Sequence, residues 1–260
     1  MTTLLEKSRN GETVDVDIID THGHLGLYQF GIPNATADIL VENMDRIGVN
    51  KIMCSSLRTI SPDIRLGNEE LYAGMQAYPD RILGYVILWP DNHESVQNEC
   101  EYWLDKGFTG IKLHTGNGHR YAAEPYHAAY AIANERKLPF LFHVWGVPTE
   151  FEDIIMIAEK YPDISIIMAH TGSYDLDGYI RIAQAFDNVY LEICYSLAPN
   201  GLIDTLCERI GSEKVLYGSD CHFYSMTQQI GRVLGAKCSD EEKTNILGGN
   251  AQKMLDRIER

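Results

Sequence analysis

Eight short apolar runs, each followed by a longer segment of helical periodicity, organise the 260-residue sequence. The runs are rich in β-branched and aromatic residues, which favour strands. Their ends recur every 24 to 33 residues, enough for one strand, one helix and two loops. We therefore expect strands at Val16–His24, Lys51–Ser56, Ile82–Trp89, Gly110–His114, Pro139–Val144, Ile164–His170, Val189–Cys194 and Val215–Ser219.

Eight β/α units in about 250 residues predict an α/β fold, a single (β/α)8 barrel of the TIM type. A doubly wound open sheet is the structural alternative, but the chain contains neither G-x-G-x-x-G nor the P-loop motif that such nucleotide enzymes carry. No linker or composition shift divides the chain. We expect one domain over residues 1–260, with a C-terminal helical extension at about 239–260.

Capping residues predict where some helices begin. Thr149 with Glu152, and Ser239 with Glu242, have the spacing of capping boxes. Asn250 follows two glycines and is a candidate N-cap of a last short helix.

Charge and cysteine usage exclude several functional classes. The formal charge is 22 minus 37, or −15, which argues against nucleic-acid and anionic membrane partners. The six cysteines form no C-x-x-C pair, and scattered single thiols suit a reducing compartment. Neither a signal peptide nor a membrane span is indicated. We expect a cytoplasmic protein that acts on a small molecule.

Polar residues gather where the expected strands end, at the face where barrels of this kind place their active sites. His22 and His24 are two apart, so they share one face of the first strand. Imidazole nitrogens and a carboxylate suit Zn²⁺ or a similar divalent ion. The candidates for one shared site are His22, His24, His143, His170 and Asp220.

Six segments resemble the amidohydrolase superfamily, specifically the amidohydrolase-2 group of metal-dependent hydrolases and decarboxylases. They are I-D-T-H-G-H (19–24), G-I-K-L-H (110–114), L-P-F-L-F-H (138–143), I-I-M-A-H-T-G (166–172), V-L-Y-G-S-D (215–220) and I-L-G-G-N-A (246–251). The resemblance implies one divalent ion, Zn²⁺ before Mn²⁺, held by His22, His24, His143 and Asp220. It makes His170 an acid/base, or a ligand of a second ion, and Asp220 the base that takes a proton from metal-bound water.

Five further residues are candidates for substrate contact, each with a plainer alternative. Arg58 could meet a substrate carboxylate or form a surface ion pair. Lys112 is either a cation in the barrel or, less in keeping with its place on the strand, a carboxylated metal bridge. Trp145 could stack on a planar substrate or close the barrel mouth. His114 is expected to line the pocket, and His222 lies on the loop after the eighth strand.

The leading functional hypothesis is hydrolysis of an ester, lactone or amide in a small, carboxylate-bearing substrate by a metal-activated water. The alternative is metal-dependent, non-oxidative decarboxylation of an aromatic or unsaturated acid. A third hypothesis, a vestigial site without activity, fits poorly with five polar residues at the strand ends. Because the loops after the first two strands are short, a partner subunit could help to cover the mouth, and a homodimer is one expectation.

Overall fold

The computed structural model describes residues 2–28, 31, 32, 35–60, 63–194 and 199–259. All eight expected strands are present, in sequence order, and each pairs in parallel with the next. Most end a few residues earlier than the apolar runs do. They are β1 (Ile19–Leu25), β2 (Lys51–Ser56), β3 (Ile82–Ile87), β4 (Gly110–Leu113), β5 (Pro139–Phe142), β6 (Ser165–Met168), β7 (Val189–Glu192) and β8 (Val215–Leu216).

Backbone hydrogen bonds between β1 and the segment that begins with β8 close the sheet. The amide of Thr21 donates to the carbonyl of Tyr217 at 3.0 Å, and the amide of Asp220 donates to that of His22 at 2.7 Å. The amide of His24 donates to the carbonyl of Cys221 at 2.6 Å. The predicted (β/α)8 barrel is therefore confirmed, and its closing contacts lie within the candidate site.

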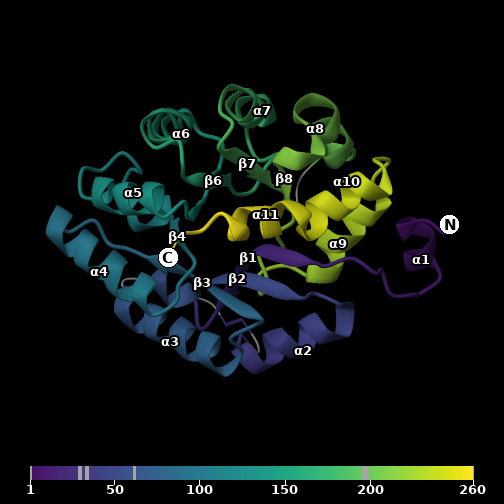
Figure 1. Ribbon diagram of the computed structural model, residues 1–260, viewed down its shortest axis with the longest axis horizontal. Coiled ribbons are helices and arrows are strands. Elements are labelled where there is room, and N and C mark those ends of the chain that lie inside the picture. The colour runs from purple at the N-terminus through teal and green to yellow at the C-terminus, as the bar shows by residue number, and fades with distance from the viewer. Residues whose placement is uncertain (1, 29–30, 33–34, 61–62, 195–198, 260) are drawn as a thin grey trace.

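Helices surround the barrel, one after nearly every strand (Figure 1). Within the described ranges, no helix is long and apolar enough to cross a membrane. The helices are α1 (Leu4–Arg9), α2 (Ala37–Ile47), α3 (Ile64–Ala77), α4 (His93–Asp105), α5 (Tyr126–Glu135), α6 (Pro148–Lys160), α7 (Leu176–Ala185), α8 (Leu202–Ile210), α9 (Met226–Gly235), α10 (Asp240–Thr244) and α11 (Asn250–Asp256).

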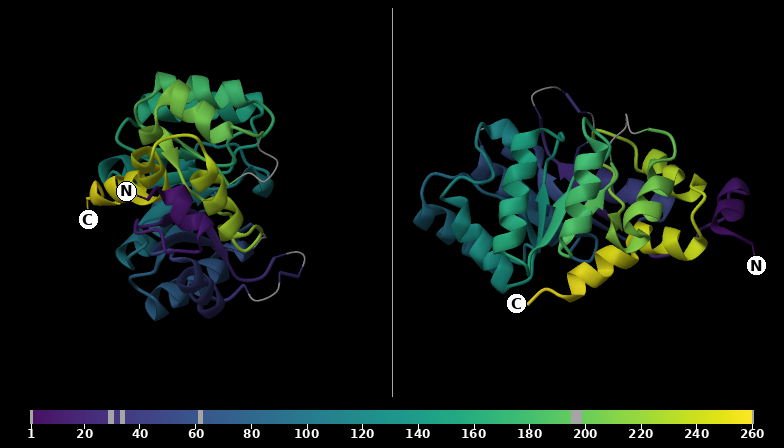
Figure 2. Two further views of the ribbon diagram at one scale, coloured as in Figure 1. Left: turned by 90° about the vertical axis from the view of Figure 1, so that its right-hand side faces the viewer. Right: turned by 90° about the horizontal axis from the view of Figure 1, so that it is seen from above.

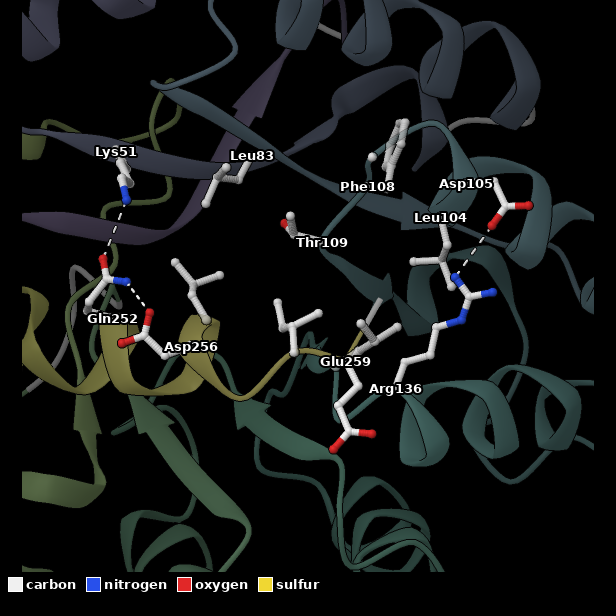
Figure 3. Close-up of a pocket in the computed structure, with 14 residues that line it drawn as sticks. Lys51, Leu83, Leu104, Asp105, Phe108, Thr109, Arg136, Gln252, Asp256 and Glu259 are labelled. Carbon is white, nitrogen blue, oxygen red and sulfur yellow. Dashed lines mark hydrogen bonds and ion pairs between the residues drawn. The ribbon is translucent and has the colours of Figure 1, made fainter.

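The barrel interior is packed, and α11 seals one end of it (Figure 2). Ala251 and Met254 of α11 join the buried cluster formed by strand residues such as Met53, Tyr85 and Leu141. Beside α11, at the amino ends of the strands, lies a hollow of about 480 Å³ (Figure 3). The interior is thus apolar at mid-height, which leaves the opposite end for polar chemistry.

One predicted capping box is confirmed and the other is wrong. Ser239 and Glu242 form a complete capping box at α10. Helix α6, however, begins at Pro148 rather than after Thr149. The carboxylate of Glu150 accepts the amides of Trp145, Gly146 and Val147. Proline at the first position and an acidic residue in the first turn favour this earlier start.

The N-cap expected at Asn250 is also wrong. A π-helical turn over Asn245–Gly249 joins α10 to α11 without interruption. The Asn250 side chain instead donates to the carbonyls of Ser212 and Val215 at 2.7 and 2.8 Å. A Cβ on Gly248 would overlap the carbonyl oxygen of Asp17. The glycine therefore permits a close approach to β1 rather than a helix stop.

Candidate active site

A cavity of about 400 Å³ lies at the carboxyl ends of the strands. Polar side chains from the ends of β1, β4, β5, β6 and β8 form one part of its lining. Aromatic and apolar side chains from the loops after β1, β2, β5 and β8 form the rest. The lining residues are His24, Tyr28, Ile60, Lys112, His114, His143, Trp145, His170, Asp220, Phe223 and Tyr224.

Three of the predicted ligands meet at this end of the barrel. Nε2 of His24 lies 2.9 Å from Oδ1 of Asp220, and Nε2 of His22 lies 3.6 Å from the same oxygen. Nδ1 of His24 contacts the hydroxyl of Ser55 at 3.1 Å, so Ser55 holds the ring from behind. Both imidazoles are buried. As predicted, they share one face of β1 and converge with the carboxylate.

Two site residues have left-handed backbones. His170 has φ +61° and Asp220 has φ +58°, a region that residues with a Cβ seldom adopt. Such conformations persist where the surrounding structure fixes them, and they cluster at functional sites. Here the amide of Asp220 bonds to the carbonyl of His22, so the barrel closure itself holds the Asp220 backbone.

Lys112 extends from β4 to the β1 histidines. Its Nζ lies 2.5 Å from Nε2 of His22 and 3.4 Å from Nε2 of His24, and the side chain is 1% exposed. Burial lowers the pKa of Lys112 to about 8, although the nearby Asp220 acts in the opposite direction. Lys112 is therefore a cation buried in the barrel, among the atoms that the resemblance assigns to the metal.

A second group of imidazoles stands on β5, β6 and the end of β4. Nδ1 of His143 lies 3.0 Å from Nε2 of His170, and the ring of His143 stacks on that of His114 with centroids 3.8 Å apart. Nδ1 of His114 accepts the amide of Gly116 at 2.8 Å. Nε2 of His143 is buried and has no hydrogen-bond partner among the described residues.

Burial keeps these imidazoles neutral. It lowers the pKa of His22, His24 and His143, and it lowers the pKa of His114 and His170 to about 3. Lys112 contributes to each of these shifts in the same direction. Burial raises the pKa of Asp220, against the influence of His170 and Lys112. A neutral imidazole is the form that binds a metal ion or accepts a proton.

The donors fit a divalent ion. His22, His24 and Asp220 offer ligand atoms within 4.8 Å of one another, and all three are buried. Nε2 of His143 is a further potential ligand atom, since it is buried and forms no hydrogen bond with any described residue. Nitrogen and carboxylate donors of this kind suit Zn²⁺ and Mn²⁺. The ammonium of Lys112 lies against the same nitrogens, so an ion that binds them and a protonated Lys112 in this position exclude each other.

Sequence reasoning missed two residues: Glu192, the last residue of β7, and Cys194, two positions later. Both are fully buried. Oε2 of Glu192 lies 3.1 Å from Nδ1 of His22, and Sγ of Cys194 lies 3.0 Å from Nδ1 of His170. Burial raises the pKa of Glu192 to about 8, while the donors around it act in the opposite direction. A carboxylate in the otherwise apolar run V-Y-L-E-I-C was the signal available.

Of the five expected substrate contacts, Lys112, His114 and Trp145 line the cavity. Arg58 is not among the lining residues, and its Nε pairs with Glu70 at 3.3 Å. The ion pair, offered as the alternative for Arg58, is what the structure contains.

His222 is not among the lining residues either. It lines a neighbouring hollow beside α2, with Asn43 and Arg46. Its neighbour Cys221 does not line the cavity either, and burial raises the pKa of that thiol to about 12. Neither residue is placed to touch a substrate in the cavity.

Comparison with known proteins identifies relatives of this chain. A family model described as Amidohydrolase matches residues 54–257. That span includes His143, His170 and Asp220 but begins after His22 and His24, whose place in the site comes from the geometry alone. No curated protein is similar enough in sequence to match the chain.

Solved structures share the fold at low sequence identity. An uncharacterised TIM-barrel protein from Bordetella bronchiseptica has a TM-score of 0.77 at 17% identity, covering 93% of this chain and 99% of its own. A 4-oxalomesaconate hydratase from Rhodopseudomonas palustris has a TM-score of 0.70 at 16% identity, covering 92% and 96%. A dihydroxybenzoic acid decarboxylase from a Polaromonas species, with bound manganese and an inhibitor, has a TM-score of 0.70 at 15% identity, covering 93% and 97%.

Proposed function

Because the chain belongs to the amidohydrolase family, we propose that it is a metal-dependent hydrolase of a small, carboxylate-bearing ester, lactone or amide. One observation carries the proposal. Neutral imidazoles and the carboxylate of Asp220 converge on one cavity at the carboxyl end of a closed barrel. Hydrolysis by an activated water needs such a set of donors beside a base.

The ion would be held by His22, His24, His143 and Asp220. We propose Zn²⁺ as the first choice and Mn²⁺ as the second. When bound there, a divalent ion polarises a substrate carbonyl and makes a water molecule more acidic. Manganese in the Polaromonas decarboxylase supports a divalent ion in this fold. A single ion leaves His170 free for proton transfer, and a second ion would make it a ligand.

The chain's own residues supply the remaining chemistry. Asp220 accepts the proton of the attacking water, helped by burial, which raises its pKa. His170 is neutral and lines the cavity, so it can donate to or accept from the leaving group. Lys112 and His114 bind the substrate carboxylate. Nδ1 of His114 is already an acceptor, so its Nε2–H is available as a donor.

A different observation favours decarboxylation as the second candidate. The rings of Trp145 and His170 are nearly parallel, with an interplanar angle of 11° and centroids 5.5 Å apart. Tyr28 and Phe223 add an edge-to-face aromatic pair to the lining. A planar aromatic acid would suit these surfaces. The dihydroxybenzoic acid decarboxylase and the oxalomesaconate hydratase act on unsaturated acids by their names, which supports a substrate of that class.

Metal content and bond cleavage test the proposal together. The protein is purified without chelator or metal-affinity tag, and Zn and Mn are measured per chain in wild type and His143→Ala. We expect about one ion per chain in wild type and less in the variant. About two ions per chain would make His170 a ligand and would favour a carboxylated Lys112 as a metal bridge. Little metal, with no activation on adding Zn²⁺ or Mn²⁺, would overturn the metal-dependent proposal.

The reaction type is read from labelled products. A set of carboxylate-bearing lactones, esters and amides is incubated in ¹⁸O-water, and a set of hydroxylated benzoic acids is assayed for carbon dioxide release. Incorporation of ¹⁸O into an acid product supports hydrolysis. Release of carbon dioxide without such incorporation would contradict hydrolysis and support decarboxylation.

We also propose a reducing, cytoplasmic location and a homodimer. All six cysteines are free thiols, which supports the first. The short loops of the barrel mouth are the argument for the second. Light scattering on the purified protein tests the dimer, and a monomeric mass would contradict it.

A further inference from the structure

Trp145 combines an exposed side chain with a backbone whose polar groups are bonded to other loops. The residue is 39% exposed and lines the active-site cavity. Its amide donates to Oε2 of Glu150 at 2.8 Å, and its carbonyl accepts the hydroxyl of Ser173 at 2.7 Å and the amide of Tyr174 at 3.1 Å. Mobile loops have few bonds of this kind. The backbone of Trp145 is therefore fixed although its ring faces the cavity mouth.

Glu150 does more than cap helix α6. In a capping box, the third residue of the helix bonds to the amide of the N-cap residue, which is Val147 here. That bond is the longest of three at 3.4 Å, because the amides of Gly146 and Trp145 lie 3.2 and 2.8 Å from the same Oε2 atom. Gly146 has φ +83°, a conformation that lets successive amides point to one acceptor. The carboxyl group is thus directed to the segment that follows β5.

The other oxygen of Glu150 reaches the neighbouring loop. Oε1 accepts the hydroxyl of Thr115 at 3.3 Å, and Thr115 follows His114, which also lines the cavity. Glu150 is 4% exposed, so these bonds are shielded from water. Because backbone amides can only donate, Oε2 is their acceptor whether or not the carboxyl group is ionised. Glu150 therefore joins the loops after β4 and β5 at the wall of the cavity.

The ring of Trp145 stands beside two imidazoles of the proposed chemistry. Its centroid lies 4.5 Å from that of His143 in an edge-to-face contact and 5.5 Å from that of His170 in a nearly parallel one. A planar group packed against Trp145 is therefore placed next to both imidazoles. Offset stacking needs two flat surfaces. An aromatic ring on a fixed backbone consequently selects planar over puckered groups.

We propose that Trp145 is a specificity-determining residue, a preorganised surface for a planar group of the substrate, and that Glu150 is the positioning residue that holds it. The inference rests on the proposed function for the place of the substrate in this cavity. It applies to hydrolysis and to decarboxylation alike, because it concerns how the substrate is held rather than which bond breaks. Preorganisation lowers the cost of ordering a contact residue on binding.

Ligand pairs that differ mainly in planarity test the role of Trp145. Benzoate and cyclohexanecarboxylate form one pair, and benzamide and cyclohexanecarboxamide form a neutral one. Binding to the protein as purified is measured by ligand-detected NMR titration. We expect the aromatic member to bind about 3- to 10-fold more tightly, the usual range for one aromatic contact. Trp145→Leu keeps an apolar wall and should lower this ratio to about one.

The wild-type titrations also separate this inference from the proposed function. A ratio near one in both pairs, or no binding of any of these ligands, would overturn the inference. Preference for benzamide in a protein that binds neither acid would support the inference and contradict a carboxylate-bearing substrate.

Glu150→Ala tests the positioning role. The aromatic preference should fall most of the way to the Trp145→Leu value, while the affinity for cyclohexanecarboxylate stays within about twofold. Glu150→Gln keeps an oxygen for the amides and should recover most of the preference. The double variant Trp145→Leu/Glu150→Ala should bind benzoate as Trp145→Leu does, since Glu150 acts through Trp145. A wild-type preference in Glu150→Ala, or additive losses in the double variant, would contradict the positioning role.

Asp153→Ala is the matched control on the same helix. Asp153 is likewise a buried carboxylate that accepts a backbone amide, and its hydrogen bonds within the described ranges go to Arg120 and the amide of Ala122. This variant should be less stable but keep the aromatic preference. An equal loss of preference would mean that any damage to α6 has this effect, and it would overturn the role of Glu150.

Ser173→Ala keeps the inference testable if Glu150→Ala does not fold. It removes one of the two bonds to the Trp145 carbonyl and leaves the bond from the Tyr174 amide. The aromatic preference should fall about twofold, because one hydrogen bond of the fixed backbone is lost. An unchanged preference in this variant would contradict the claim that the fixed backbone of Trp145 determines selectivity.

Discussion

The two ends of the barrel carry hollows of similar size and opposite chemistry. The amino-end hollow has about 480 Å³ and the carboxyl-end cavity about 400 Å³. At the amino end, the polar and charged groups contact one another. Arg136 pairs with Asp105 at 3.5 Å, and Gln252 joins Lys51 and Asp256 by hydrogen bonds (Figure 3). At the carboxyl end, the polar groups are nearly all buried.

The difference shows that burial of polar groups, rather than volume, marks the site. Burying a charge or a polar group is costly unless its partners are supplied. At the carboxyl end this cost falls on several neighbouring side chains, including Lys112, His22 and Asp220, and their pKa values shift as a result. At the other end, Lys51 and Arg136 are only partly buried and Asp256 is exposed. Perturbed groups that cluster in one cavity are the usual sign of function.

Replacing one carboxylate at each end should give the largest contrast. Asp220→Asn removes a proposed ligand and the proposed base, so kcat/KM should fall by about 10³-fold or more. Asp256→Asn is the same change at the amino end and should leave kcat/KM within about twofold. Steady-state kinetics on the substrate identified above measures both. Equal losses in the two variants would remove the functional distinction between the ends.

Gly248 gives the reverse contrast, because it should affect folding rather than catalysis. A Cβ there would overlap the backbone carbonyl of Asp17, so Gly248→Ala should destabilise the protein by about 2–3 kcal/mol. Denaturant unfolding measures the loss. Gly231→Ala is the matched control, since a Cβ meets nothing within 4 Å there and alanine favours the helix by about 0.5–1 kcal/mol. The folded fraction of Gly248→Ala should keep the wild-type kcat. A large loss of kcat would mean that the packing of α11 against the amino end of the barrel affects catalysis.

The sequence predicts the strands and the strand-end histidines well, because both follow from periodicity. Period two places His22 and His24 on one face, and apolar runs mark strands buried on both sides. It predicts less well where tertiary contacts decide. Asn250 resembles an N-cap but binds the carbonyls of Ser212 and Val215, across the fold. The contact between Glu192 of β7 and His22 of β1 is likewise one that no spacing within the chain reveals.

Lys112 sharpens the comparison within the carboxyl end, since its charge competes with a metal ion for the same nitrogens. Lys112→Met should therefore bind Zn²⁺ at least about tenfold more tightly, because a nearby cation is removed from a poorly solvated site. Substrate affinity should fall if Lys112 binds the substrate carboxylate. Titration calorimetry of the chelator-treated protein measures the metal affinity. Weaker Zn²⁺ binding would instead make Lys112 a ligand, directly or as the carboxylated lysine.

Arg136→Ala should have the smallest effect on stability and activity. It tests directly whether the amino-end hollow has any part in function. The pair with Asp105 is partly exposed, so its loss should cost less than about 0.5 kcal/mol in the free energy of unfolding. The bond from the amide of Glu259 to the carbonyl of Arg136 is kept in the variant. We expect kcat/KM within about twofold of wild type. A clear loss of kcat/KM with unchanged stability would mean that the larger hollow influences the smaller cavity across the apolar interior, and that the two ends are not independent.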